Sequence, residues 1–330
     1  MSDELPPIEK HSLPISTRAP GKCILFGEHA VVHGAPELVL AVDLDTQVIV
    51  RSGAKTRLNG DDDAVGRNPY FRAALERLWR SQNPLEIRAV SRIPRAAGLG
   101  SSAAFVAALT AALSAANGGI SRATLAQVSF DIEHAAQGVG SPGDTSAAVA
   151  GGYVTLNAGD GRPVWTVTKG SQEWIVRQAP DPGWTWIVAD SGIPRSTGDA
   201  VRAVGARLAR PDGPELLERF RAVALDGIRA IAREDRAGTA HAMRANHELL
   251  REVGVSHPRL EDLIRSVSEC AVAAKLTGAG AGGSIVALPV PGREAECVRR
   301  LARAGALAFA VRPSNRGAGL VSGADAGTSR

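Results

Sequence analysis

The sequence predicts an α+β protein of two domains, and three observations support this fold class. The chain has 330 residues, 44% of them hydrophobic and 22% charged, which is enough for one large or two medium cores. Strand-like and helix-like segments are mixed, without the strict β-α-β alternation that predicts a doubly wound parallel sheet. Near residue 180 the pattern changes to a mainly helical half, which indicates a second domain.

The domain boundaries follow from composition. Residues 1–15 hold three prolines and charges of both signs, and residues 313–330 are rich in Gly and Ser. Both segments are therefore expected to be flexible, the first as a leader and the second as a tail. Between them we expect an N-terminal domain over residues 16–180 and a C-terminal domain over residues 181–312.

The pattern of apolar residues predicts the individual elements. Strands are expected where Val, Ile, Leu and Thr are dense or alternate with polar residues. These segments are 16–24, 38–50, 85–93, 152–156, 163–168, 173–178, 184–189, 271–276, 284–288 and 306–311. Helices are expected where apolar residues recur every three or four positions. These segments are 69–81, 101–116, 121–138, 197–209, 214–236, 239–253, 258–270 and 294–304. The acidic and Gly-containing segment 59–69 is expected to be a solvated loop.

Composition and charge exclude several classes of function. The net charge of +4 is not concentrated in Lys/Arg runs with interleaved aromatic residues, so we expect no nucleic-acid partner. The polar N-terminus lacks the apolar segment of a signal peptide, and the longest apolar stretch, 102–116, is too short to span a bilayer. Three cysteines without a C-x-x-C pair are typical of a reduced compartment. We therefore expect a soluble cytoplasmic protein without a membrane partner.

One glycine-rich segment has the pattern of a phosphate-binding turn. It runs from Pro94 to Ala104, and in it a strand ends, a turn holds Gly98 and Gly100, and a helix opens with two serines. A helix N-terminus offers unpaired N–H groups to a polyphosphate, glycines allow close approach, and a Ser hydroxyl can reach Mg²⁺. The equally simple interpretation is a tight turn before a core helix. No Walker A sequence is present.

The same segment leaves a serine hydrolase open as a remote alternative. Gly100-Ser-Ser102-Ala-Ala approximates the turn that exposes a nucleophilic serine. That function needs a partner His and a Gly after the serine. In this chain the position of that Gly holds Ala.

A second glycine-rich segment starts at Lys275 and contains Gly278, Gly280 and Gly283 with G-x-G-x-x-G spacing. A dinucleotide-binding turn requires a helix directly after it, whereas residues 284–288 read as a strand. We therefore interpret it as a loop between strands, where the backbone passes close to a ligand or another loop.

A third segment, near the N-terminus, runs from Ala19 to Gly34 as APGKCILFGEHAVVHG. Lys22 is one of only five lysines in an Arg-rich chain, which suggests that a compact ammonium group is needed there. His29 and His33 have a spacing that could bind zinc on a helix. The flanking glycines and valines make a helix, and so a zinc site, improbable.

Taken in order, these three segments resemble the signature motifs of the GHMP superfamily of small-molecule kinases. Within this superfamily, the similarity is strongest to mevalonate kinases. It lies in the N-terminal segment, in Asp190–Thr197, and in Asn246–Leu250 followed by Lys275-Leu-Thr-Gly-Ala-Gly. The resemblance covers residues 17–312, and Ser141-Pro-Gly-Asp144-Thr is similar to archaeal members.

The resemblance implies a two-domain GHMP kinase fold with the ATP and substrate cleft between the domains. It implies that Mg²⁺ is the cofactor, held by Ser102 and Glu133. It also implies a loop around the ATP phosphates, made of Pro94, Gly98, Leu99, Gly100, Ser101, Ser102, Ala103 and Ala104.

The resemblance further implies the reaction and its residues. Asp144, eleven residues after Glu133, matches the catalytic aspartate, and Lys22 matches the lysine beside it. The implied substrate-side residues are Lys22, Glu28, His29, Ser141, Asp144, Thr197, Gly278 and Ala279. The expected activity is ATP-dependent phosphorylation of (R)-mevalonate to (R)-5-phosphomevalonate in isoprenoid biosynthesis, by a monomer or a homodimer.

One feature leaves a second substrate open. The stretch Gln137–Ser141 resembles phosphomevalonate kinases, so phosphomevalonate kinase or another GHMP small-molecule kinase remains the alternative. A chain that binds ATP or mevalonate without turnover is disfavoured by the presence of Lys22, Glu133 and Asp144 together.

Overall fold

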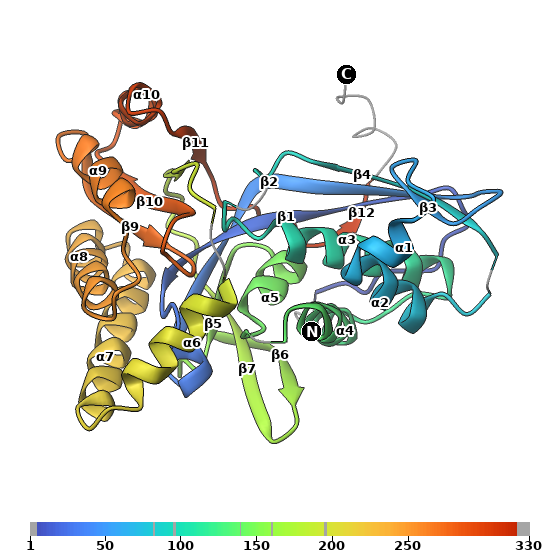
Figure 1. Ribbon diagram of the computed structural model, residues 1–330, viewed down its shortest axis with the longest axis horizontal. Helices are drawn as coiled ribbons and strands as arrows, with labels where there is room; N and C mark the ends of the chain where they lie inside the picture. The colour runs from blue at the N-terminus through green and yellow to red at the C-terminus, as the bar shows by residue number, and fades with distance from the viewer. Residues whose placement is uncertain are drawn as a thin grey trace.

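The computed structural model describes residues 5–81, 83–94, 97–138, 140–159, 161–194 and 197–321. It is a mixed α/β structure with two sheets (Figure 1). The larger sheet has the strand order β12-β1-β2-β5-β7-β6, with β4 paired to β2 and β3 paired to β4. The smaller sheet has the order β11-β8-β10-β9.

The strands lie close to the segments expected from the apolar pattern. Their bounds are β1 Ile15–Phe26, β2 Glu37–Ser52, β3 Arg57–Leu58, β4 Leu85–Ser91, β5 Tyr153–Leu156, β6 Arg162–Lys169, β7 Gln172–Ala179, β8 Trp186–Asp190, β9 Ala271–Thr277, β10 Ser284–Pro289, β11 Leu307–Val311 and β12 Gly319–Leu320.

The helices also lie near the expected segments. Their bounds are α1 Ala64–Arg67, α2 Pro69–Leu78, α3 Ser101–Ala116, α4 Arg122–Gln137, α5 Gly143–Ala150, α6 Thr197–Leu208, α7 Gly213–Ala232, α8 Arg236–Glu252, α9 Pro258–Ser266 and α10 Glu294–Arg303, with a 3-10 turn at Ala30–His33. The Ser121 side chain accepts a hydrogen bond from the Thr124 N–H and Gly138 ends α4, so both ends of this helix carry residues that are typical of helix caps.

The alanine-rich helix α3 forms the centre of the N-terminal half. It packs against β1 and β2, and its middle positions are fully buried. Small side chains let the helix lie close to the sheet, and the Thr17 hydroxyl donates a 2.7 Å hydrogen bond to the Ala108 carbonyl across this contact. This packing places the N-terminal end of α3 beside β1, where the glycine-rich turn begins.

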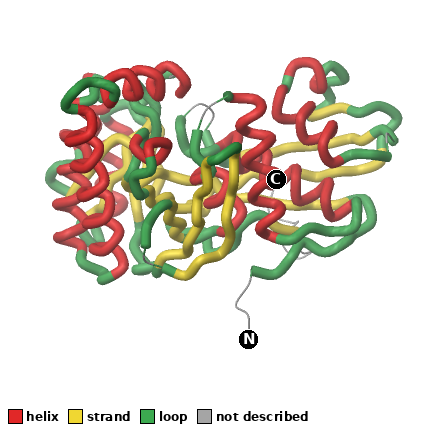
Figure 2. The backbone as a smooth tube through the Cα atoms, turned by 90° about the horizontal axis from the view of Figure 1, so that it is seen from below, coloured by secondary structure: helices red, strands yellow, loops and turns green. Residues whose placement is uncertain are grey.

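The C-terminal half has its own core around the smaller sheet. Helix α8 packs on β9, α9 on β10 and α10 on β11, while α7 lies against α8. Figures 1 and 2 show α7, α8 and α9 gathered at one end of the molecule and α1 and α2 at the other. The two halves meet where β1 approaches β9.

The two terminal segments differ from the flexible leader and tail expected from composition. Ile8 is buried, and its backbone exchanges two hydrogen bonds with Ile120, at 2.9 and 2.8 Å. Residues 319–320 form β12, which pairs with β1 and so covers the edge of the larger sheet. Apolar burial and edge pairing therefore order both segments as far as they are described; residues 1–4 and 322–330 lie outside the described part.

Two short helices lie outside the segments predicted from the apolar pattern. The segment 59–69, predicted as a solvated loop, contains the single-turn helix α1. Helix α5 follows Ser141 and Pro142 directly and is almost completely buried. Its small residues fit between α3, α4 and β1, which explains why periodicity gave no signal for it.

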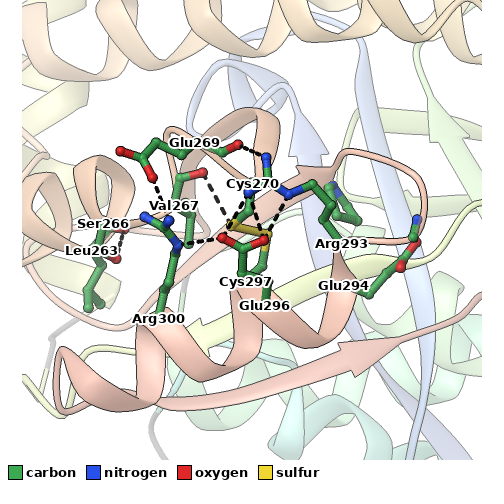
Figure 3. Close-up of a disulfide and its surroundings, with 12 residues drawn as sticks. Leu263, Ser266, Val267, Glu269, Cys270, Arg293, Glu294, Glu296, Cys297 and Arg300 are labelled. Carbon is green, nitrogen blue, oxygen red and sulfur yellow. Dashed lines mark hydrogen bonds and ion pairs between the residues drawn. A yellow bond between two sulfur atoms is a disulfide. The ribbon is translucent and has the colours of Figure 1, made fainter.

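Two cysteines are paired, which the odd number and wide spacing of the cysteines did not predict. Cys270 precedes β9, Cys297 lies on α10, and both are buried in the disulfide shown in Figure 3. The disulfide joins α10 to the smaller sheet. The two cysteines are 27 residues apart in the sequence. Within the described ranges, the chain has no helix long and apolar enough to cross a membrane.

Candidate active site

Lys22 lies on β1 with its side chain enclosed between the two halves of the site. It is 2% exposed, and its backbone N–H donates a 2.9 Å hydrogen bond to the Leu99 carbonyl. Gly21 makes this approach possible, since a Cβ at that position would lie 2.8 Å from the Leu99 oxygen. β1 therefore fixes the glycine-rich turn and the lysine relative to each other.

The glycine-rich turn ends at the N-terminus of α3. Gly100 has φ of +74°, and it gives α3 no side-chain cap, so the first N–H groups of the helix are left for another acceptor. These groups face the larger of two adjoining pockets. The predicted turn residues that line this pocket are Pro94, Gly98, Gly100, Ser101 and Ser102. A concave site at a helix N-terminus suits an anion such as a polyphosphate.

Asp144 lies in the first turn of α5 and forms an ion pair with Lys22. The Lys22 Nζ is 2.8 Å from the Asp144 Oδ1, and the aspartate side chain is 34% exposed while that of Lys22 is 3% exposed. The carboxylate is thus held by a buried ammonium group and still reaches the pockets.

Ser102 and Glu133 meet across the first turn of α3 and the last turns of α4. The Ser102 hydroxyl donates a 2.6 Å hydrogen bond to Glu133 Oε1, and the Gln137 amide donates a second bond of 3.0 Å to the same oxygen. Burial, and then the nearby charge of Asp144, raise the pKa of Glu133 to about 7. The Glu133 carboxylate of this pair lies near the charge of Asp144.

The smaller pocket contains most of the predicted substrate-side residues. Its lining includes Glu28, His29, Ser141, Asp144, Gly278 and Ala279. Asp144 and the two loop residues Gly278 and Ala279 line the larger pocket as well. The carboxylate of Asp144 therefore lies where the two pockets meet.

A buried ion pair links the two halves beneath the smaller pocket. The Lys275 ammonium on β9 hydrogen-bonds the Glu28 carboxylate and also donates a 2.8 Å bond to the Leu276 carbonyl. Both side chains are almost completely buried. Burial raises the pKa of Glu28 and lowers the pKa of Lys275, while the attraction between the two charges opposes both shifts.

Three further hydrogen-bonded contacts hold the loop after β9 against the N-terminal half. The Thr277 hydroxyl donates to the Ile24 carbonyl at 2.8 Å and accepts from the Ile24 N–H at 2.9 Å. His29 Nε2 is 3.0 Å from the Ala279 carbonyl oxygen, and the Ser284 hydroxyl donates to the Ala97 carbonyl at 2.6 Å. All three glycine-rich segments thus converge on one site.

Some predicted residues are placed elsewhere. Leu99, Ala103 and Ala104 are buried behind the turn, and they line neither pocket. Thr197 begins α6, but its side chain lies outside the described residues, as does Arg195. The spacing of His29 and His33 does not fall on an α-helix, because His29 precedes and His33 ends the 3-10 turn Ala30–His33. Among the described residues, no three His, Cys, Asp or Glu side chains form a group that could hold a metal ion.

Three residues in or beneath the site had no role predicted from the sequence. Glu37 lines the smaller pocket, Gln137 lines both pockets, and Lys275 pairs with Glu28 beneath them. The rarity of lysine gave a signal for Lys275. A charged residue opening the apolar strand β2 could have indicated Glu37.

The chain matches family models at both halves of this site. The model of the GHMP kinases N terminal domain matches residues 69–152, and that of the GHMP kinases C terminal domain matches residues 228–307. The chain therefore belongs to the GHMP kinase family, whose members carry out ATP-dependent phosphotransfer.

Within this family the chain is similar to mevalonate kinases. It is 32% identical to the mevalonate kinase of Archaeoglobus fulgidus, over 82% of this chain and 90% of that protein. It is also 32% identical to the mevalonate kinase of Aeropyrum pernix, over 92% of this chain and 97% of that protein.

Solved structures confirm the fold. The mevalonate kinase of Methanococcus jannaschii superimposes with a TM-score of 0.73 at 22% identity, covering 91% of this chain and 98% of that one. The L. major mevalonate kinase in complex with R-mevalonate gives 0.75 at 23% identity, covering 93% and 100%. A Streptococcus pneumoniae phosphomevalonate kinase gives 0.72 at 17% identity, covering 92% and 100%, so fold similarity alone does not select the substrate.

Proposed function

We propose that this protein transfers the γ-phosphoryl group of ATP to the C5 hydroxyl of (R)-mevalonate. One observation carries the proposal: Asp144, paired with Lys22 at 2.8 Å, lies where the two pockets meet. Phosphoryl transfer to an alcohol needs a carboxylate that accepts the hydroxyl proton, placed between the acceptor and the phosphate donor.

The larger pocket is the proposed site of the ATP phosphates. Its turn combines the uncapped N-terminus of α3 with Gly98 and Gly100, so backbone N–H groups can contact the phosphate oxygens closely. Lys22 lines the same pocket and supplies a positive charge beside the transferred group. In this arrangement the γ-phosphate points towards Asp144.

The smaller pocket is the proposed acceptor site. Glu28, His29 and Ser141 provide carboxylate, imidazole and hydroxyl groups for the polar substituents of mevalonate. The family resemblance adds Thr197, at the start of α6, to the proposed acceptor site. Glu28 Oε2 is buried without a hydrogen-bond partner among the described residues, which leaves it for a substrate hydroxyl. Asp144 then removes the proton from the C5 hydroxyl.

Ser102 and Glu133 are the proposed ligands of Mg²⁺. Their oxygens are joined by a 2.6 Å hydrogen bond beside the turn, and hard oxygen donors of this kind suit Mg²⁺, which binds few protein ligands together with phosphates. When bound, the ion neutralises phosphate charge. The same hydrogen bond disfavours the serine hydrolase, since the Ser102 hydroxyl is directed to a carboxylate and not to a histidine.

An assay of ADP release tests the proposed substrate. Purified protein with Mg²⁺ and ATP is expected to release ADP when (R)-mevalonate is added. With 5-phosphomevalonate, galactose or homoserine it is expected to release little ADP. Turnover with 5-phosphomevalonate instead would assign the alternative function, and no ADP with any acceptor would reject both.

We also propose a cytoplasmic location, and size measurement in solution would decide between a monomer and a homodimer.

Replacing Gly100 tests the phosphate turn. Gly100→Ala is expected to raise the KM for ATP about tenfold or more, because the new Cβ would lie 2.7 Å from Lys22 Cγ at a backbone φ of +74°. Overpacking of this kind costs about 1–3 kcal/mol. Steady-state kinetics with varied ATP measures the change.

Gly254→Ala is the matched control. Its φ is +78°, and a Cβ there meets no atom of the described residues within 4 Å. We expect it to leave the KM for ATP unchanged. An equal change in both variants would show that backbone strain alone, and not the contact with Lys22, causes the effect.

A further inference from the structure

Glu37 is a buried carboxyl in the smaller pocket to which neither the motifs nor the reaction assigns a role. It is the first residue of β2, where it pairs with Leu156 of β5, and its side chain is 1% exposed. It lines the pocket together with Ser141 and Asp144. A buried carboxyl is costly unless neighbouring groups satisfy it, so its contacts indicate what it does.

Those contacts lead directly to the segment that carries Asp144. The Ser141 hydroxyl donates a 3.1 Å hydrogen bond to Glu37 Oε2. The same oxygen packs against the first residue of α5, because a Cβ on Gly143 would lie 2.2 Å from it. Asp144 is the next residue, and Ser141 lies two residues before Gly143. Glu37 thus contacts both sides of the turn that presents the proposed base.

We propose that Glu37 is a positioning residue of the acceptor pocket, whose carboxyl holds the Ser141 hydroxyl and the first turn of α5 and so sets the acceptor relative to Asp144. This inference rests on the proposed function, because that function defines the acceptor. A misplacement of about 1 Å between reacting groups can cost on the order of 100-fold in rate, so a contact of this kind affects kcat.

The charge of Glu37 has a second consequence for the acceptor. Burial, and then the charge of Asp144, raise the pKa of Glu37 to about 8, while Lys22 and the Ser141 hydrogen bond oppose the shift and Glu28 adds to it. At pH 7 the group is therefore mainly neutral. Above pH 8 it ionises and adds a negative charge to a pocket that already holds Glu28, Glu133 and Asp144. Binding of an anionic acceptor is therefore expected to weaken above pH 8.

Two substitutions separate positioning from charge. Glu37→Gln can still accept the Ser141 hydrogen bond but does not ionise, so kcat at pH 7 is expected within about threefold of wild type. Its KM for mevalonate should stay level between pH 7 and 9, where that of wild type rises. Glu37→Leu loses the hydrogen bond, and its kcat is expected to fall about 10- to 100-fold with the KM for ATP within about twofold. Glu173→Leu, at an exposed site on β7, is the control.

The outcomes are distinct from those of the proposed function. If wild type does not phosphorylate mevalonate, the proposed substrate fails, and the same variants are compared with the acceptor that wild type uses. If wild type is active and Glu37→Leu keeps its kcat, or Glu37→Gln keeps the wild-type rise in KM, the inference is overturned. A loss in Glu37→Leu that affects ATP and mevalonate alike would also overturn it, since it indicates a structural defect.

An unfolding experiment tests the buried carboxyl without any substrate. A carboxyl whose pKa is about 8 in the folded state and ordinary in the unfolded state binds its proton more tightly when folded. Its contribution to stability is full below the unfolded pKa of 4.5 and is lost as the pH rises through 8. The denaturation midpoint of wild type should therefore fall more between pH 5 and 8 than that of Glu37→Gln. Equal falls would contradict the buried neutral carboxyl.

Discussion

Asp144→Asn is expected to lower kcat by at least about 100-fold, because a positioned base contributes on the order of 10²–10⁴ in rate. The amide keeps the size of the side chain but accepts no proton from the acceptor hydroxyl. Lys22 then loses the carboxylate 2.8 Å away, and the positive charge remains beside the phosphates. The Kd for ATP should therefore change little or tighten. Single-turnover kinetics and calorimetric titration with ATP measure the two quantities separately.

Asp226→Asn is the control for this substitution. Asp226 lies on the exposed side of α7, away from both pockets, so the same chemical change there should leave kcat and ATP binding as in wild type. Turnover of Asp144→Asn close to that of the control would remove Asp144 from the role of base. Loss of ATP binding in Asp144→Asn would instead indicate that the ion pair shapes the nucleotide pocket.

Lys275→Met is expected to lower the free energy of unfolding by about 3–5 kcal/mol, the usual cost of leaving one partner of a buried ion pair without the other. Lys275 is fully buried and Glu28 is 1% exposed, so water cannot replace the lost charge. The cost should be smaller at pH 5 than at pH 8, because the pKa of Glu28 is already raised by burial and the isolated carboxyl can protonate. Denaturant unfolding at both pH values measures this.

The double variant Lys275→Met/Glu28→Gln separates the pair from packing. With both charges removed, part of the lost stability is expected to return, which a double-mutant cycle quantifies. Strictly additive effects would mean that the two side chains do not stabilise each other. Since Glu28 also lines the acceptor pocket, the double variant should recover stability without recovering a wild-type KM for the acceptor.

The elements of this protein were largely predictable from local sequence patterns. Helices α3 and α4 lie where the recurrence of apolar residues predicts them. Helix α5 gave no periodic signal, because all of its residues except Asp144 are buried and leave no continuous polar face. The order of the terminal segments was not predicted either, since a few apolar residues are enough to dock a chain on an existing core, as Ile8 does.

Residue patterns predicted three glycine-rich segments and the rare Lys22, and the resemblance to GHMP kinases added the carboxylates Glu133 and Asp144, eleven residues apart. These signals are local, since each depends on residue types a few positions apart. Which of these groups come into contact is visible only in the folded chain. It pairs Lys275 with Glu28 across 247 residues, joins Ser141 to Glu37 across 104, and places Asp144 between two pockets. Such contacts arise from the packing of two halves of the chain, and no local pattern records that packing.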